Sequence, residues 1–137
     1  QAVPHIKRPD LERAFSGFVG EIEQVPPMYS AVRFKGRKLY KLARKGLTVE
    51  AEPRKILIKR LDIKEIDLPR VSFSLVCSKG TYVRQLCVDI GEVLGCGAHL
   101  SRLTRTRCGD FTLASAVTVD ELKKTDAKEL SGKLLTV

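Results

Sequence analysis

A strand-to-helix junction at residues 78–84, SKGTYVR, brings together a glycine, a tyrosine and an arginine. Thr81 fits the N-cap of the following helix, which makes Tyr82 its first residue and Arg84 its third. The helix dipole opposes a cation in the first turn by roughly 0.3–1 kcal/mol, and a capping box would have Glu or Gln at position 84. A residue placed against its local preference is a candidate for function. We therefore expect an anionic partner for Arg84; the alternative is an arginine that leans into solvent.

The neighbours of Arg84 are suited to binding a base. Gly80 allows a ligand to approach the backbone closely, and Tyr82 can stack on a planar, unpaired base. No Ser-His-Asp arrangement or phosphate-binding loop is visible in the sequence, and we interpret His5 and His99 as structural. These residues by themselves predict a domain that binds nucleic acid.

A second feature is the basic segment, residues 33–46, RFKGRKLYKLARKG, which contains no acidic residue. Most of the net charge of +9 comes from it, as expected for a phosphate-binding surface. The alternative is a solvated basic helix face. Tyr40 can stack on a base or pack on the domain, and packing is the simpler interpretation. The candidate phosphate contacts in the segment are Arg33, Lys35, Arg37, Lys38, Lys41, Arg44 and Lys45.

The elements that position these residues follow from hydrophobic periodicity. Residues 54–68 and 71–78 indicate two antiparallel strands, although Lys59 and Arg60 disturb the alternation of the first. Residues 83–94 have the spacing of an amphipathic helix, and Gly95 closes it. Three further helices are predicted, near residues 9–18, over 37–45, and after the capping box of Thr118 and Glu121. The fold class is therefore α+β, a mostly antiparallel mixed sheet flanked by helices.

Composition limits the remaining possibilities. The 137 residues are enough for one domain, and the chain has neither a membrane-length apolar run nor a signal-peptide core. Four cysteines occur without a C-x-x-C pair, which argues against a zinc site and a disulfide framework. A reducing, cytoplasmic setting fits best.

The motifs in order carry a resemblance to a known family. The blocks PPMYSA, KGTYVR and GCGAHL, together with the longer stretches around them, resemble the TruB family of bacterial tRNA pseudouridine synthases over roughly residues 10–125. The resemblance implies isomerisation of uridine-55 in the tRNA T loop. In this reaction the N-glycosidic bond is cut, the base turns, and C5 joins C1′ of the ribose. It also implies that no cofactor or metal takes part, and that the uridine is flipped into a pocket.

The resemblance further implies roles for particular residues. Tyr82 is similar to the tyrosine that packs against the flipped base, and Arg84 to the arginine that pairs with the catalytic aspartate. Leu103 resembles a leucine that lines the uracil pocket, and Tyr29 is a further substrate-binding candidate. The basic segment resembles part of a mobile thumb that closes on the T stem-loop. Two more RNA contacts are expected, Lys79 and Arg105, although Thr104 stands where the family more often has arginine.

One departure from the family pattern is an absence. The nucleophilic aspartate belongs to a G-x-L-D-P block, which this sequence does not contain. We therefore expect residues 1–137 to be the C-terminal part of a catalytic domain, without its nucleophile-bearing half and without the family's C-terminal RNA-binding domain. Such a piece is expected to be inactive alone. Arg84 would then be exposed, bound to an anion or paired with a substitute carboxylate.

The expected partner is tRNA, with no membrane and no small-molecule cofactor. The intact enzyme is expected to be monomeric, whereas the piece can self-associate through apolar surface that the missing half would cover. Two rival interpretations stay open at this point. One is a non-catalytic basic RNA-binding module that reuses the scaffold, and the other is a structural or protein-interaction domain.

Overall fold

The structure is a computed structural model that describes residues 5–30, 33–34, 36–47, 49, 51–126 and 129. The chain forms two compact units, residues 1–101 and residues 102–137, which are described separately. No helix in the described part of the chain is long and apolar enough to cross a membrane.

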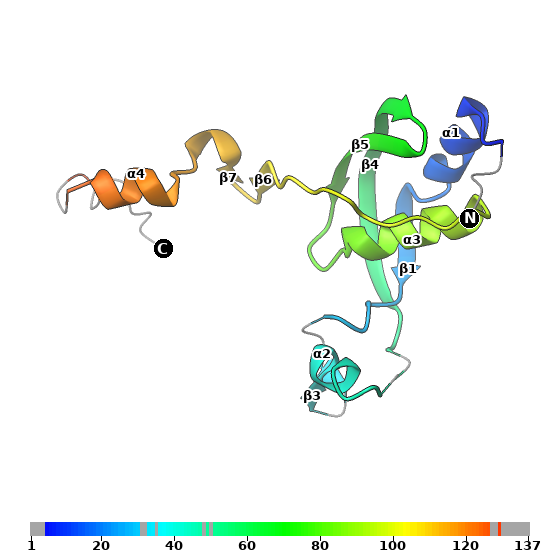
Figure 1. Ribbon diagram of the computed structural model, residues 1–137, viewed down its shortest axis with the longest axis horizontal. Coiled ribbons are helices and arrows are strands. Elements are labelled where there is room, and N and C mark those ends of the chain that lie inside the picture. The colour runs from blue at the N-terminus through cyan, green and yellow to red at the C-terminus, as the bar shows by residue number, and fades with distance from the viewer. Residues whose placement is uncertain are drawn as a thin grey trace. The chain divides into compact units, whose positions relative to one another are not determined.

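The first unit contains a three-stranded sheet, two helices that pack on it, and a smaller segment between its strands (Figure 1). In chain order its elements are α1 (Arg8–Ser16), β1 (Gly20–Gln24), β2 (Arg33–Phe34), β3 (Arg37–Lys38), α2 (Leu39–Ala43), β4 (Arg54–Asp67), β5 (Arg70–Cys77) and α3 (Val83–Val93).

The sheet has the order β1-β4-β5, and both strand pairs are antiparallel. Helices α1 and α3 lie on the same side of it (Figure 1), and their apolar faces share one core with β4. The core residues are Leu11, Phe15, Ile56, Ile58, Leu61, Leu86 and Ile90. The rings of Phe15 and Phe73 meet edge to face with centroids 5.4 Å apart. The predicted α+β class is confirmed.

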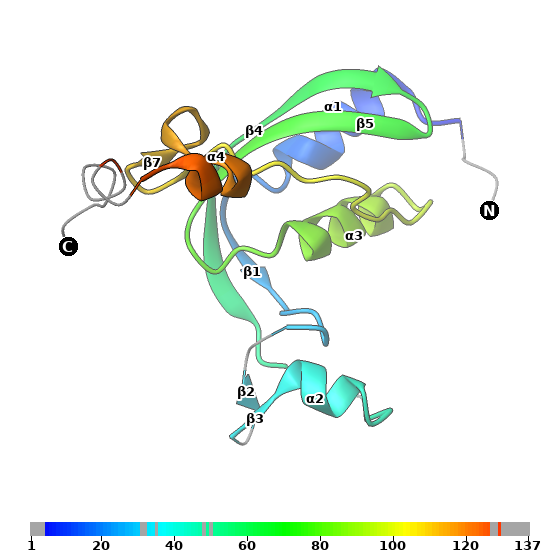
Figure 2. The same ribbon diagram turned by 60° about the vertical axis from the view of Figure 1, so that its left-hand side comes forward.

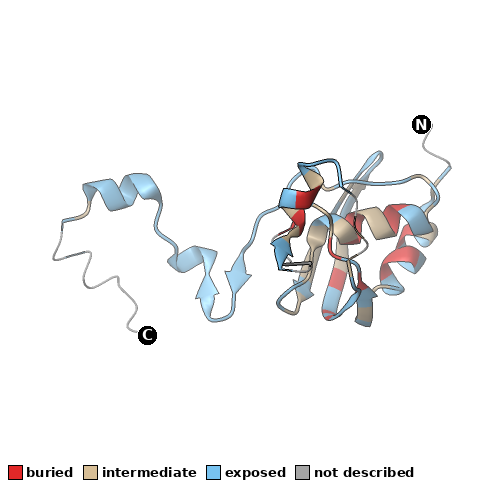
Figure 3. Cartoon of the chain, turned by 90° about the horizontal axis from the view of Figure 1, so that it is seen from below, coloured by how far each residue is buried: buried red, intermediate tan, exposed pale blue. Residues whose placement is uncertain are grey.

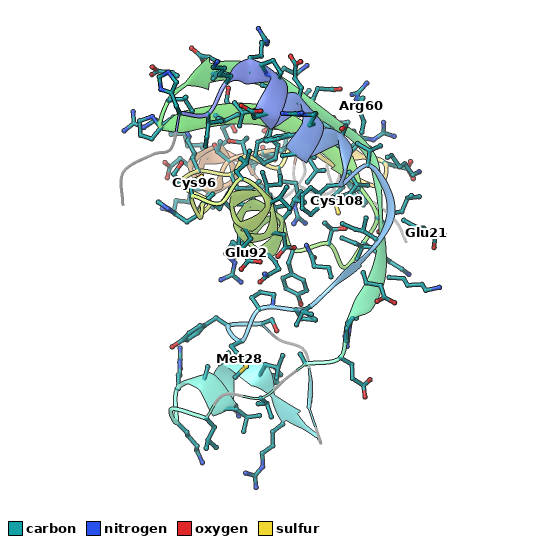
Figure 4. All side chains as sticks on the ribbon, turned by 90° about the vertical axis from the view of Figure 1, so that its right-hand side faces the viewer. Glu21, Met28, Arg60, Glu92, Cys96 and Cys108 are labelled. Carbon is teal, nitrogen blue, oxygen red and sulfur yellow. The ribbon has the colours of Figure 1, made fainter. Side chains whose placement is uncertain are left out.

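Two irregularities in β4 explain why its sequence does not alternate cleanly. The register against β5 shifts between Ile58 and Arg60 and again between Ile63 and Glu65. Each shift adds one residue to β4, which returns the next apolar side chain to the core face. Figure 4 shows Arg60 pointing to the side of the sheet away from α3. The disturbance at Lys59 and Arg60 is therefore a bulge within a continuous strand.

Some features differ from the sequence prediction. Strand β1 is not predicted, because it is short, begins at a glycine and lies close after another glycine, Gly17. The predicted helix over 37–45 is shorter, since Arg37 and Lys38 pair with β2 in a small hairpin. Val93 belongs to the predicted apolar face of α3, yet its side chain is 64% exposed.

The second unit contains β6 (Arg107–Cys108), β7 (Phe111–Thr112), a 3-10 turn (Leu113–Ser115) and α4 (Val119–Lys124). Its described elements bury none of their residues among themselves (Figure 3). The predicted capping box begins α4: the Thr118 hydroxyl accepts from the Glu121 N–H at 3.2 Å, and the Glu121 carboxylate accepts from the Thr118 N–H at 2.8 Å.

A close backbone approach fixes the far end of α3. The Gly91 carbonyl accepts hydrogen bonds from the N–H groups of Cys96 (3.2 Å) and Gly97 (2.9 Å). A Cβ atom at Gly91 would collide with the backbone of Gly97 and Ala98. Residues 95–98, which begin the GCGAHL block, therefore fold back on a helix position that has room only for glycine.

We expect Gly91→Ala to lower the free energy of unfolding by about 3 kcal/mol, since overpacking against backbone cannot be relieved by a rotamer change. Gly17→Ala is the matched control: Gly17 has φ −65°, and its nearest new contact would be an ordinary 3.5 Å. That change should be neutral or stabilise by up to about 1 kcal/mol. Urea unfolding measures both; equal midpoints for the two variants would contradict the close approach.

Candidate functional site

The turn between β5 and α3 is held by β4 and by its own side chains. The Ser78 N–H donates to the Leu57 carbonyl at 2.8 Å, and the Ser78 hydroxyl accepts from the Leu57 N–H at 3.0 Å. Gly80 has φ 85°, a left-handed conformation that favours glycine. The Thr81 hydroxyl donates to the Ser78 carbonyl at 2.9 Å. The sheet therefore sets the position from which α3 begins.

The helix begins one residue later than the sequence predicts. Tyr82, not Thr81, is the N-cap, with extended backbone at φ −99° and ψ 101°. Thr81 lies one residue before the N-cap, and its hydroxyl donates within the turn, so the Thr81 prediction is wrong. Arg84 is consequently the second residue of α3, still in the first turn, and the dipole argument against a cation there is unchanged.

The backbone of Tyr82 is bound by the side chain of Gln24, the last residue of β1. Gln24 Oε1 accepts from the Tyr82 N–H at 2.8 Å, and Nε2 donates to the Tyr82 carbonyl at 3.1 Å. The same carbonyl accepts the Leu86 N–H at 3.0 Å. Gln24 is 2% exposed, and both the oxygen and the nitrogen of its buried amide have hydrogen-bond partners.

Sequence reasoning did not select Gln24, although a signal was present. In β1, Gln24 lies on the same face as Ile22, because side chains alternate along a strand. A polar residue is therefore placed at an inward position. Such a residue needs hydrogen-bond partners from elsewhere in the chain.

Arg84 contacts the segment that follows β1. Its guanidinium donates to the Tyr29 carbonyl at 2.9 Å, and the side chain is exposed. In the described part of the chain no carboxylate forms an ion pair with it. The carboxylate of Asp89, on the same helix, accepts from Gln85 at 2.8 Å. The structure therefore shows the exposed outcome expected for Arg84, while its anionic partner stays a prediction.

Two contacts thus join residues 24–29 to residues 82–84. Between them stand Pro26 and Pro27, whose rings fix φ and stiffen the chain. Tyr29 is 61% exposed and Tyr82 is half-buried. The predicted residues Tyr29, Tyr82 and Arg84 are therefore placed at one junction, although their chemical roles stay predictions.

The remaining predicted contacts lie in other parts of the structure. Lys79 is exposed in the turn before α3. Leu103, which is 55% exposed, and Arg105, which is also exposed, belong to the second unit. Their participation in the site stays a prediction.

The basic segment leaves the end of the sheet where β1 stops and β4 begins (Figure 2). Leu39 and Leu42 are the buried residues of α2. Met28 points toward α2 (Figure 4), and the Tyr40 N–H donates to the Ser30 carbonyl at 3.1 Å. Consecutive carbonyls, those of Tyr29 and Ser30, therefore accept hydrogen bonds from α3 and α2 respectively.

Most cations of the basic segment whose side chains the structure describes are exposed. Lys41, Arg44 and Lys45 are exposed, as is Arg37. Lys38 Nζ and the Arg44 guanidinium lie 5.8 and 5.5 Å from the Tyr40 ring centroid, within cation–π range. Tyr40 is thus flanked by two cations of its own segment, and whether its ring packs on the domain or stacks on a base stays a prediction. Of the other two predicted contacts, Arg33 begins β2 and Lys35 lies outside the described residues.

The four cysteines are free thiols. Among the described residues, no group of three or more His, Cys, Asp or Glu side chains could hold a metal ion.

Comparison with protein families assigns the chain. The model described as "TruB family pseudouridylate synthase (N terminal domain)" matches residues 1–83, which is more than half of the chain. The chain belongs to the TruB family. A second model, "tRNA pseudouridylate synthase B C-terminal domain", matches residues 84–136. The boundary between the two TruB models falls inside the first turn of α3, next to Tyr82 and Arg84.

Individual relatives agree with the TruB assignment. The chain is 51% identical over 123 residues to a tRNA pseudouridine synthase B of Pseudomonas paraeruginosa, covering 90% of this chain and 40% of the relative. It is 50% identical over 114 residues to a protein of the same name from Alkaliphilus oremlandii, covering 83% and 38%. This TruB-family chain therefore spans about 40% of the length of these curated relatives.

A solved structure shares the fold. The chain superposes on one chain of "Crystal Structure of a Cbf5-Nop10-Gar1 Complex" with a TM-score of 0.71 and 29% sequence identity. The match covers 89% of this chain and 32% of that one. The α+β arrangement of this TruB-family chain is thus found in an experimental structure.

The orientation of α3 can be tested through its cysteine. Burial raises the pKa of the Cys87 thiol, whereas Cys108 is exposed. Only the thiolate is nucleophilic, so at pH 8 we expect iodoacetamide to alkylate Cys87 at least about tenfold more slowly than Cys108.

The neutral buried thiol stabilises the fold below the unfolded-state pKa of about 8.5, and that contribution to the free energy of unfolding is lost as the pH rises above this value.

Peptide mapping after timed alkylation gives the two rates. Urea should make them equal, which controls for intrinsic reactivity. Equal rates in the native protein would mean that α3 does not turn Cys87 toward the core.

Proposed function

We propose that the intact protein containing this chain is a tRNA pseudouridine synthase that converts a T-loop uridine to pseudouridine. The observation that supports this most directly is Arg84, which is exposed at a fixed helix start in a chain of the TruB family. The nucleophilic aspartate would come from outside the 137 residues. No cofactor is part of the proposed reaction.

The contact of Arg84 with Tyr29 leaves the arginine able to take part in this chemistry. A guanidinium has five N–H donors in a fixed fork, and one terminal nitrogen donates to the Tyr29 carbonyl. The remaining donors can meet a carboxylate at two points. The Tyr29 carbonyl fixes the orientation of the guanidinium. The ion pair between Arg84 and the aspartate would keep the carboxylate ionised and directed at the sugar.

Tyr82 would pack against the flipped uracil. Its side chain is half-buried, and its backbone is fixed by Gln24, so the position from which the ring projects is fixed. Leu103 would line the uracil pocket, and Tyr29 would also contact the substrate. Unpairing a base costs a few kcal/mol, which stacking and the pocket offset.

The basic segment would hold the T stem-loop through phosphates. Phosphate contacts fix the register of an RNA without reading its sequence, which suits a surface of exposed lysine and arginine. Lys79 and Arg105 would add contacts outside the segment. The hydrogen bond from Tyr40 to Ser30 connects this surface to the peptide next to the one that holds Arg84.

Arg84→Met in the intact enzyme should lower the single-turnover rate of pseudouridine formation at least 100-fold, which corresponds to about 2.7 kcal/mol. The aspartate would lose its cationic partner, and a stranded charge is costly. The affinity for tRNA should change little, because Arg84 is not a proposed phosphate contact. Arg84→Lys should recover the rate only in part, since lysine lacks the planar fork.

Rate and affinity are measured on the same variants by quenched-flow assay and filter binding. A variant that keeps its rate and loses its affinity would identify Arg84 as a phosphate contact and refute this assignment.

Replacing Arg37, Lys38, Lys41 and Arg44 together by glutamine should weaken tRNA binding. It should also flatten the dependence of log K on log salt by about 0.7–0.9 for each phosphate that the protein no longer neutralises. The matched control replaces four exposed cations of β4, Lys55, Lys59, Arg60 and Lys64, and should leave the slope unchanged. Titrations from low to moderate salt give both slopes. An unchanged slope in the first variant would rule out the basic segment as the RNA-binding surface.

A further inference from the structure

The contacts at the helix start assign a role to a residue outside the predicted site. We propose that Gln24 is a positioning residue for catalysis: its side-chain amide fixes the Tyr82 peptide and, through it, the direction of Tyr82 and Arg84. This inference rests on the proposed function. It concerns a residue that touches neither substrate nor reacting atoms in the proposed reaction.

Gln24 binds a backbone N–H that a helix start leaves without a partner. The first N–H groups of a helix have no acceptor within the helix, and a nearby side chain normally caps them. At α3 the local candidate, Thr81, is engaged by the turn. Gln24, 58 positions away in the sequence, supplies the acceptor for the Tyr82 N–H. The start of the helix is therefore set by a different strand.

The contact between Gln24 and Tyr82 is made at two points. Oε1 and Nε2 of one planar amide meet the N–H and the carbonyl of one residue, which fixes orientation as well as distance. Gln24 is almost fully buried, so losing either hydrogen bond would leave a polar group of its amide without a partner at a cost in free energy. A rotation of the backbone at Tyr82 would break at least one of them.

The same segment also reaches Arg84. Gln24 ends β1, and five residues later the Tyr29 carbonyl accepts from the Arg84 guanidinium. The intervening Pro26-Pro27 pair restricts the chain. Residues 24–29 thus bind the backbone at the start of the helix and the side chain of Arg84. A change at Gln24 is expected to move both groups that the proposed reaction uses.

The first test compares Gln24→Met with wild type in the intact enzyme. Methionine has a similar length without hydrogen-bonding groups, so the peptide is released while the site stays filled. We expect the single-turnover rate to fall about 10–100-fold, as a displacement of about 1 Å can cause, with tRNA affinity within about threefold of wild type. Gln85→Met is the control, because Gln85 is a glutamine on α3 whose side chain donates to Asp89; its rate should not change.

The second test uses Gln24→Glu, whose charge depends on pH. The carboxylate can accept from the Tyr82 N–H but repels the carbonyl, whereas the protonated acid can accept and donate as the amide does. Burial and the carbonyl favour the acid. Arg54, opposite Gln24 in the β1–β4 ladder and exposed, favours the anion and stays charged throughout. The ratio of variant to wild-type rate should therefore rise as the pH falls from about 8 to about 5.

A wild-type rate for Gln24→Met, or a Gln24→Glu ratio of one at every pH, would overturn the positioning role. If Gln24→Met does not fold, the pH dependence of Gln24→Glu decides. Failure of the proposed function is distinguishable, because the wild-type enzyme itself would then form no pseudouridine.

Discussion

The geometry of the candidate site depends on one buried amide. Gln24 binds both the N–H and the carbonyl of Tyr82, and a buried side-chain amide without partners would be costly. An arrangement in which the two segments did not meet would leave that buried amide unpaired. The contact between Gln24 and Tyr82 therefore also sets the position of the exposed Arg84, whose own side chain makes only one described hydrogen bond, to Tyr29.

The core serves this junction by fixing the elements on either side of it. The bulges of β4 keep its apolar residues on the face that α1 and α3 cover, and Ser78 ties the turn to the same strand. At the far end of α3, Gly91 admits the backbone of the following loop. The helix is thus held at its start by the side chains of Gln24 and Ser78 and near its far end by a backbone contact at Gly91.

Sequence patterns predicted the elements with strong periodicity. The long strand pair, the inward face of α3 at Leu86 and Ile90, and the capping box of α4 follow from local rules that need no tertiary information. The pattern missed β1 and placed the start of α3 one residue early, because both depend on a contact between distant segments. Gln24 carried a weak signal, a polar residue at an inward strand position, that gains meaning only once Tyr82 is known to lie against it.

On this view the protein's own contacts assemble the site before RNA binds. Amide hydrogen exchange at Tyr82 in the RNA-free intact protein tests this most directly, because a helix N-cap amide has no acceptor within its own helix. We expect exchange at least about 100-fold slower than in an unstructured peptide. This protection corresponds to a free energy of local opening of about 2.7 kcal/mol or more. Exchange at the unstructured rate would contradict pre-assembly, since the Tyr82 N–H would then have no lasting acceptor in Gln24.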